Sequence, residues 1–217
     1  SLYRLAQERS IALVIDETGQ ILGAHHKCRL TPLDAVAYTP GEDFETWNLC
    51  GVTVGVVICY EGFRYAETTA ACVEQGAQLI FHPQNNTTRP NDWKIPVHHA
   101  MLTTRAAENT IWFASCNVCY PEYQNCRSMI IAPDGQVHAQ AEMKREELLV
   151  SDIDIDRATR AMFEAHRKKW APKRKSAHLA ARSKRGLAPM KTSLAPRPAP
   201  SQPWLRRRCG NTAIPKA

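Results

Sequence analysis

Acidic residues are missing from the last quarter of the sequence. From Arg167 to Ala217 there are 15 Lys and Arg and no Asp or Glu, which leaves 13 of the 28 basic residues against all 21 acidic ones before it. The formal net charge of +7 therefore belongs to this stretch, and residues 1–166 carry −8. Residues 167–217 are rich in Lys, Arg, Pro and Ala without periodicity, which predicts a disordered basic tail after one domain at 1–166.

Three further absences restrict the class of protein. No apolar run approaches the ~20 residues that cross a bilayer. The opening "SLYRLAQERS" places charges where a signal peptide has its apolar stretch. The eight cysteines are irregularly spaced, which argues against a disulfide framework, so we expect reduced thiols and a cytoplasmic location.

The spacing of the cysteines also argues against a metal centre. Cys116 and Cys119 lie three apart in a strand-like run, so their side chains should point to opposite faces, and beyond Cys126 no fourth ligand has suitable spacing. We therefore expect no metal centre.

The segments that are present alternate between strand and helix patterns. "IALVIDETGQILGAHHK" predicts a hairpin, and apolar runs ending at Cys59, His82 and Cys116 predict buried strands. Helical patterns occur at 2–9, about 65–75 and 97–108, a second hairpin turns at 133–135, and "ELLVSDIDID" predicts a last strand. Strands alternating with helices, together with strand pairs, indicate an α/β protein with mixed sheets.

Cys59 is the first candidate for chemistry. It ends the apolar run "VGVVIC", and the chain must turn at Tyr60-Glu61-Gly62 before a helix. A nucleophile at such a corner is presented above the sheet edge, with backbone N–H groups close to a developing oxyanion. The structural alternative is an inert buried thiol.

Lys27 strengthens the catalytic interpretation. It ends the strand "ILGAHHK", 32 positions before Cys59. An ammonium beside the thiol would lower its pKa and stabilise a tetrahedral oxyanion.

The ordered set of motifs resembles the nitrilase superfamily of carbon–nitrogen hydrolases over roughly Leu2 to Glu164. "HHKCRL" is similar to the family's lysine motif, "YTPGEDF" to its Pro-Gly loop, and "VICYEGFRYAE" to its nucleophile motif. "GAQLIFHP", "TTRAAENTIWFASCN" and "MIIAPDGQVHAQA" resemble its later segments, in the same order.

This resemblance implies an α-β-β-α sandwich that forms dimers or larger assemblies and hydrolyses a non-peptide C–N bond in an amide, carbamoyl compound or nitrile. It implies Cys59 as the nucleophile that forms a thioester, and Lys27 with the backbone N–H of Tyr60 as the oxyanion site. The substrate is expected to be a small amide or nitrile, with no cofactor and no membrane partner.

The departures from the family pattern matter as much. The family's general-base glutamate belongs to an early strand that has no counterpart here, so we expect it upstream of Ser1 and expect the 217 residues to be inactive and prone to aggregation. Asp34 is either a substrate-orienting carboxylate or a turn residue. His82 and Asn85 are candidates for orienting substrate, with a packed wall residue as the alternative for His82.

Other residues around the corner favour structural roles. Glu61, Arg64 and Glu67 suggest an ion pair at the start of the helix, and Arg105 with Asn109 suggests packing and capping. Two alternatives to hydrolysis stay open: a catalytically dead relative, and a nucleic-acid-binding protein acting through the basic tail. The tail lacks regularly spaced aromatics, which makes the second alternative the less favoured one.

Overall fold

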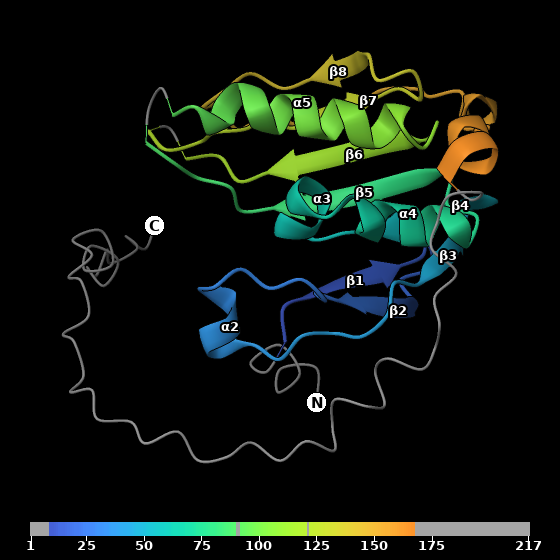
Figure 1. The fold of residues 1–217 in the computed structure, drawn as a ribbon, viewed down its shortest axis with the longest axis horizontal. Coiled ribbons are helices and arrows are strands. Elements are labelled where there is room, and N and C mark those ends of the chain that lie inside the picture. The colour runs from blue at the N-terminus through green and yellow to red at the C-terminus, as the bar shows by residue number, and fades with distance from the viewer. Residues whose placement is uncertain (1–8, 90–91, 121, 168–217) are drawn as a thin grey trace, which may run out of the picture. The chain divides into compact units, whose positions relative to one another are not determined.

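The computed structural model describes residues 9–89, 92–120 and 122–167 (Figure 1). The expected helix at 2–9 and the expected basic tail lie outside these ranges except for Arg9 and Arg167, so both stay predictions.

The first sheet is the hairpin that the sequence predicts. β1 (Ile11–Ile15) and β2 (Ile21–His26) pair antiparallel, with Ile11 opposite His26. The turn between them is held by Asp16, whose carboxylate accepts hydrogen bonds from the backbone of Thr18 and Gln20. Lys27 is therefore the first residue after β2.

The second sheet has six strands in the order β3-β4-β5-β6-β7-β8. The central strands β4 (Val52–Val56), β5 (Leu79–Gln84) and β6 (Trp112–Asn117) run parallel. β3 (Thr46–Leu49), β7 (Met129–Ile131) and β8 (Val137–Gln140) pair antiparallel at the two sides. The expected mixed α/β sheet is confirmed.

Helices connect the parallel strands (Figure 1). α3 (Tyr60–Arg64) and α4 (Ala66–Glu74) lead from β4 to β5, and α5 (Lys94–Ala107) leads from β5 to β6. The short helix α2 (Asp34–Ala37) lies between the two sheets in sequence. A 3-10 turn, η1 (Ile155–Arg157), and a π-helical turn, η2 (Phe163–Arg167), end the described chain. Among the described residues, no helix combines the length and apolarity needed to cross a membrane.

Two apolar layers follow from this arrangement. One packs the helices on the six-stranded sheet, with Ile80, Leu102 and Phe113 fully buried. The other packs the hairpin on the sheet's opposite face, through Val14 and Val54. The order helix, sheet, sheet is the described part of the predicted sandwich.

One predicted element is confirmed and another differs in the structure. The helix expected at about 65–75 is α4, and a separate short helix, α3, precedes it because Tyr65 adopts an extended conformation (φ −126°, ψ 94°) between the two. The segment "ELLVSDIDID" is not a ladder strand: Leu148 and Val150 are 87% and 77% exposed, and the Asp154 carbonyl accepts from the Trp112 indole instead.

Candidate active site

Cys59 lies at a sharp corner between strand and helix. Beyond β4 the chain stays paired with β5, because Cys59 N–H donates to the Pro83 carbonyl at 2.9 Å. Cys59 itself has φ 48° and ψ −105°, a conformation rare for a residue with a side chain, and α3 begins at the next residue. Such strain costs about 1–3 kcal/mol and persists only where neighbours enforce it. Cys59 as a whole is half-buried.

A chain of hydrogen bonds behind the corner enforces this conformation. Burial lowers the pKa of His82 to about 4, so its imidazole is neutral at pH 7. Its Nε2 lies 2.8 Å from the Cys59 carbonyl and its Nδ1 lies 2.9 Å from Ser115 Oγ. A carbonyl only accepts, so Nε2 donates to it and Ser115 donates to Nδ1, while Gln84 Nε2 donates to Ser115.

Side-chain hydrogen bonds also hold α3, the helix after the corner. Arg105, from α5, donates from Nε to the Gly62 carbonyl and from Nη2 to the Phe63 carbonyl, both at 3.1 Å. Asn109 donates from Nδ2 to the Arg105 carbonyl. The predicted packing role of Arg105 is therefore seen directly, and its target is the segment that carries the nucleophile candidate.

Lys27 is buried, with 4% of its surface exposed, and its ammonium lies 2.6 Å from the Asp34 carboxylate. Burial alone would raise the pKa of Asp34, but hydrogen bonds from Lys27 and Thr31 outweigh it and hold the pKa below its ordinary value. Asp34 is thus an ionised partner of Lys27. The structure brings this pair together, a contact that the sequence did not predict.

The charges of Lys27 and Asp34 both affect the pKa of the Cys59 thiol. Burial raises the pKa of its thiol, against the opposing effects of the Lys27 charge and of hydrogen bonds from backbone N–H groups of Asn85 and Tyr60. The Asp34 charge raises the pKa further. The expected lowering of the pKa by Lys27 is present, but burial has the larger effect and the net shift is upward. The resting thiol is therefore protonated, and a base is required to activate it.

Asn85 and His82, the remaining predicted site residues, interact with different groups of Cys59. Asn85 reaches the sulfur through its backbone N–H. His82 is 1% exposed, with both ring nitrogens engaged inside the protein, so its contact with the site is the Cys59 carbonyl. The substrate-orienting roles of Asp34, His82 and Asn85 stay predictions.

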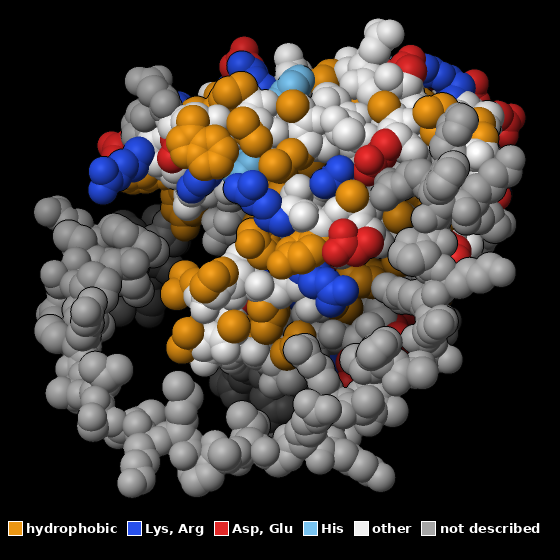
Figure 2. All heavy atoms as spheres, in the orientation of Figure 1, with side chains coloured by type: hydrophobic (Ala, Val, Ile, Leu, Met, Phe, Trp, Pro, Cys, Tyr) orange, Lys and Arg blue, Asp and Glu red, His pale blue; other side chains and the backbone are white. Residues whose placement is uncertain are grey.

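Apolar surface lies beside Asp34. Figure 2 shows hydrophobic side chains over α2, where Leu33 and Val36 are 78% and 84% exposed. A second apolar region is a cavity of about 300 Å³ between β1 and the sheet, lined by residues that include Leu13 and Phe81, and it does not include Cys59 or Lys27.

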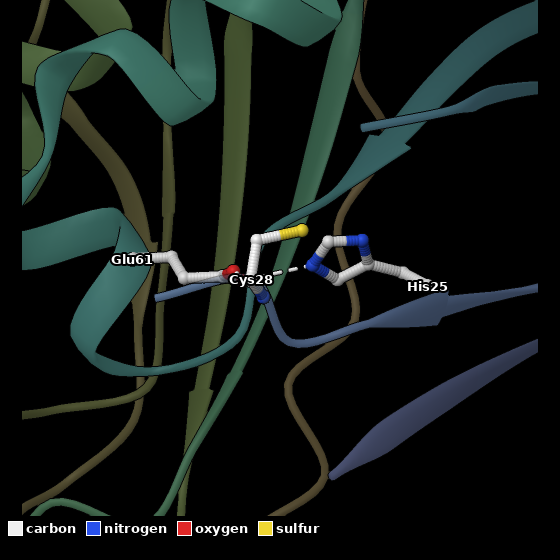
Figure 3. Close-up of side chains that lie close together, drawn as sticks. All are labelled: His25, Cys28 and Glu61. Atoms are coloured by element: carbon white, nitrogen blue, oxygen red, sulfur yellow. Dashed lines mark hydrogen bonds and ion pairs between the residues drawn. The ribbon is translucent and has the colours of Figure 1, made fainter. Parts of the chain in front are cut away.

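Sequence reasoning missed a buried cluster next to Lys27. His25 Nε2, Cys28 Sγ and an oxygen of Glu61 lie within 4.8 Å of one another (Figure 3). Glu61 forms a hydrogen bond with His25 at 2.8 Å, rather than the ion pair expected at the start of the helix. The available signal was the alternation of β2, which turns His25 inward.

This cluster has the ligand types of a metal site but is better described as a hydrogen-bonded one. Both oxygens of Glu61 already accept hydrogen bonds, from His25, Cys28, Arg29 and Ile58. Burial, with the Glu61 charge, raises the pKa of Cys28 to about 12, and a thiol binds zinc only as the thiolate.

Comparisons with known proteins match most of the described chain. A family model described as carbon–nitrogen hydrolase matches residues 10–162. The omega-amidase NIT2 of Mus musculus is 28% identical in an alignment of 157 positions that covers 65% of this chain and 54% of that protein. The N-carbamoylputrescine amidase of Arabidopsis thaliana is 25% identical over 184 residues, covering 76% and 59%. This chain thus spans little more than half the length of these curated relatives.

Solved structures agree with these matches. An amidase from Nesterenkonia sp. superposes with a TM-score of 0.62 at 27% identity, covering 75% of this chain and 62% of that one. A carbon–nitrogen hydrolase from Helicobacter pylori G27 superposes with a TM-score of 0.67 at 17% identity, covering 75% and 64%, which supports the fold alone. In a variant of the Nesterenkonia amidase, the acetamide moiety of fluoroacetamide is added covalently at the active-site cysteine.

Proposed function

The chain belongs to the carbon–nitrogen hydrolase family, and from this premise we propose that Cys59 is the nucleophile and Lys27 the oxyanion-binding cation of an amidase-type hydrolase. The observation that supports this most directly is the convergence on one partly exposed thiol of a buried ammonium and two backbone N–H donors, those of Tyr60 and Asn85.

The proposed reaction begins with attack of the Cys59 sulfur on the carbonyl carbon of a small amide. The thiol proton leaves to a base, and the negative charge on the former carbonyl oxygen is held by the Tyr60 N–H and the Lys27 ammonium. Collapse of this intermediate breaks the C–N bond, and the leaving nitrogen takes the proton as ammonia or an amine. Water then hydrolyses the thioester, releasing the acid and restoring the thiol.

Asp34 is a poor candidate for the base. Its pKa is held below the ordinary value by Lys27 and Thr31, whereas the thiol it would deprotonate has a raised pKa. We therefore assign Asp34 to orienting Lys27 or the substrate amide. The base is proposed to be a glutamate outside these 217 residues, so the chain alone is expected to be inactive toward amides, while Cys59 still reacts with alkylating reagents.

Covalent labelling tests the nucleophile. The Cys59 thiol loses its proton to solvent, and the thiolate then displaces fluoride from fluoroacetamide, so that the S–C bond forms as the C–F bond breaks. We expect labelling of Cys59 to saturate with reagent concentration and to slow about tenfold in Lys27→Met. Peptide mass spectrometry follows each cysteine separately, so the exposed Cys50 and Cys116 serve as internal controls whose rates stay unchanged.

Two results would separate the parts of this proposal. Equal labelling of Cys59 with and without Lys27, rising linearly with reagent, would remove the site assignment. Steady ammonia release from a short aliphatic amide, lost in Cys59→Ala, would instead keep the nucleophile and refute the placement of the base outside the chain.

A further inference from the structure

Lys27 and Cys59 belong to different sheets. Lys27 follows β2 of the hairpin, and Cys59 follows β4 of the six-stranded sheet. In the part of the chain that the structure describes, no ladder pairing joins the two sheets. Reaction geometry tolerates errors of less than about 1 Å, so some other contact must fix the distance between the ammonium and the sulfur.

The carboxylate of Glu61 makes that contact. Its Oε1 accepts from the backbone N–H groups of Cys28 at 2.6 Å and Arg29 at 3.1 Å, the two residues after Lys27. Its Oε2 accepts from the backbone N–H of Ile58 at 2.6 Å, the residue before Cys59. One side chain thus holds the segments that carry both candidate groups.

His25 completes the coordination of this carboxylate. Its Nε2 lies 2.8 Å from Oε2, and its ring stacks on Phe44 with centroids 5.3 Å apart. With four donors on two oxygens, the acceptor sites of Glu61 are filled, and the side chain is fully buried. A carboxylate held this way has one orientation, which Figure 3 shows pointing toward His25 and the Cys28 backbone.

We propose that Glu61 is a positioning residue that fixes the distance between Lys27 and Cys59 by tying their two segments together, and that His25 fixes its orientation. This inference rests on the proposed function of Lys27 and Cys59. Glu61 itself touches neither sulfur nor substrate; it acts through the backbone on either side.

The ionisation of the Cys59 thiol reports that distance. The titratable groups around Cys59 are Lys27, Asp34, Glu61, His82 and Cys126. Burial lowers the pKa of His82 to about 4 and raises the pKa of Cys126 to about 11, so both are neutral near pH 8 and the field of the Lys27–Asp34 pair dominates. Movement of Lys27 away from Cys59 should raise the thiol's pKa. Direct loss of the Glu61 charge acts in the opposite direction, so a rise identifies positioning.

The experiment measures the rate of Cys59 alkylation by iodoacetamide against pH, cysteine by cysteine, in the 217-residue chain. Lys27→Met is the reference and should raise the midpoint of the Cys59 profile by about one pH unit. Glu61→Gln should raise the midpoint toward the Lys27→Met value. The amide nitrogen of Gln cannot accept the backbone N–H hydrogen bonds that one carboxylate oxygen of Glu61 accepts. His25→Leu should raise the midpoint part of the way, and His25→Gln, whose amide N–H can replace Nε2–H, should keep the original midpoint.

The outcomes distinguish this inference from the proposed function. If Lys27→Met leaves the midpoint unchanged, the Lys27–Cys59 pair fails, and the inference with it. If Lys27→Met shifts the midpoint but Glu61→Gln and His25→Leu only lower the melting temperature, Glu61 is structural and the inference alone is overturned. Should Glu61→Gln not fold, the His25 pair decides: equal midpoints for His25→Leu and His25→Gln overturn the inference.

Discussion

The ammonium of Lys27 lies 2.6 Å from the carboxylate of Asp34, and the two charges act on the Cys59 thiol with opposite signs. Lys27 favours the thiolate more strongly than Asp34 disfavours it, so Asp34 cancels part of the effect of Lys27 at the sulfur. The full charge of Lys27 becomes available only when the contact with Asp34 loosens, or when an oxyanion competes for the ammonium.

Replacing the charge of Asp34 tests this cancellation. We expect Asp34→Asn to lower the midpoint of the Cys59 alkylation profile, because the charge that raises the thiol's pKa is removed and Lys27 loses its competing partner. Loss of the charge-assisted bond should also destabilise the fold by about 1–3 kcal/mol. Asp134→Asn is the control, since it breaks only a half-exposed ion pair with Arg157. An unchanged or higher midpoint in Asp34→Asn would contradict the cancellation.

The buried His82 predicts a pH dependence of stability. Burial lowers its pKa from an ordinary 6.5 to about 4, so the unfolded chain binds a proton that the folded chain excludes between these values. Stability from His82 is therefore fully present above pH 6.5 and is lost as pH falls toward 4, by about 3 kcal/mol in total.

His82→Gln removes this titration while keeping an N–H donor for the Cys59 carbonyl. Urea unfolding across the window should show a weaker loss of stability at low pH than in the unchanged chain. The loss should not vanish, because burial also lowers the pKa of His98. His138→Gln, at an exposed position, should behave like the unchanged chain. Identical acid profiles for His82→Gln and the unchanged chain would refute the assignment of His82.

Gly62 permits the contact between His82 and Cys59. A Cβ at this position would lie 2.7 Å from His82 Nε2 and 2.8 Å from its Cδ2, so Gly62→Ala must displace the ring. We expect a destabilisation of about 1–3 kcal/mol. In a His82→Ala background the clash is gone, and the same substitution should cost less than about 1 kcal/mol. Denaturant unfolding of the four chains gives the coupling, and equal costs in both backgrounds would show that the ring is not what Gly62 accommodates.

Local patterns predicted the corner at Cys59 and the strand end at Lys27. An apolar run predicts a buried strand, and the end of the run predicts which residue follows that strand. The same reasoning failed for "ELLVSDIDID", because an apolar run predicts a strand only where a neighbouring edge accepts its ladder. In this segment the Asp154 carbonyl accepts a hydrogen bond from the Trp112 indole, and Leu148 stays exposed.

Properties that depend on the environment of a side chain could not be predicted from spacing. The net shift of the Cys59 pKa depends on burial, which a strand end does not reveal. Glu61 suggested a local ion pair, whereas its partners His25 and Cys28 lie 36 and 33 positions away. Such contacts follow from how the two sheets pack, and that is a tertiary property.

The exposed apolar side chains and the free edge of β1 predict self-association of this chain. Leu13 and Ile15 are 40% and 51% exposed and line the apolar cavity of about 300 Å³ with Phe81. Among the described strands, β1 pairs only with β2, so its other edge presents unpaired backbone groups beside an apolar surface. The average molar mass measured by light scattering should therefore rise with protein concentration. The double substitution Leu13→Lys with Ile15→Lys should reduce this rise, because it places charges on the edge. Leu148→Lys, at a residue 87% exposed and outside any strand, should leave the scattering unchanged. A constant monomeric mass in the unchanged chain at all concentrations would mean that this edge is protected by a contact other than those the described residues make.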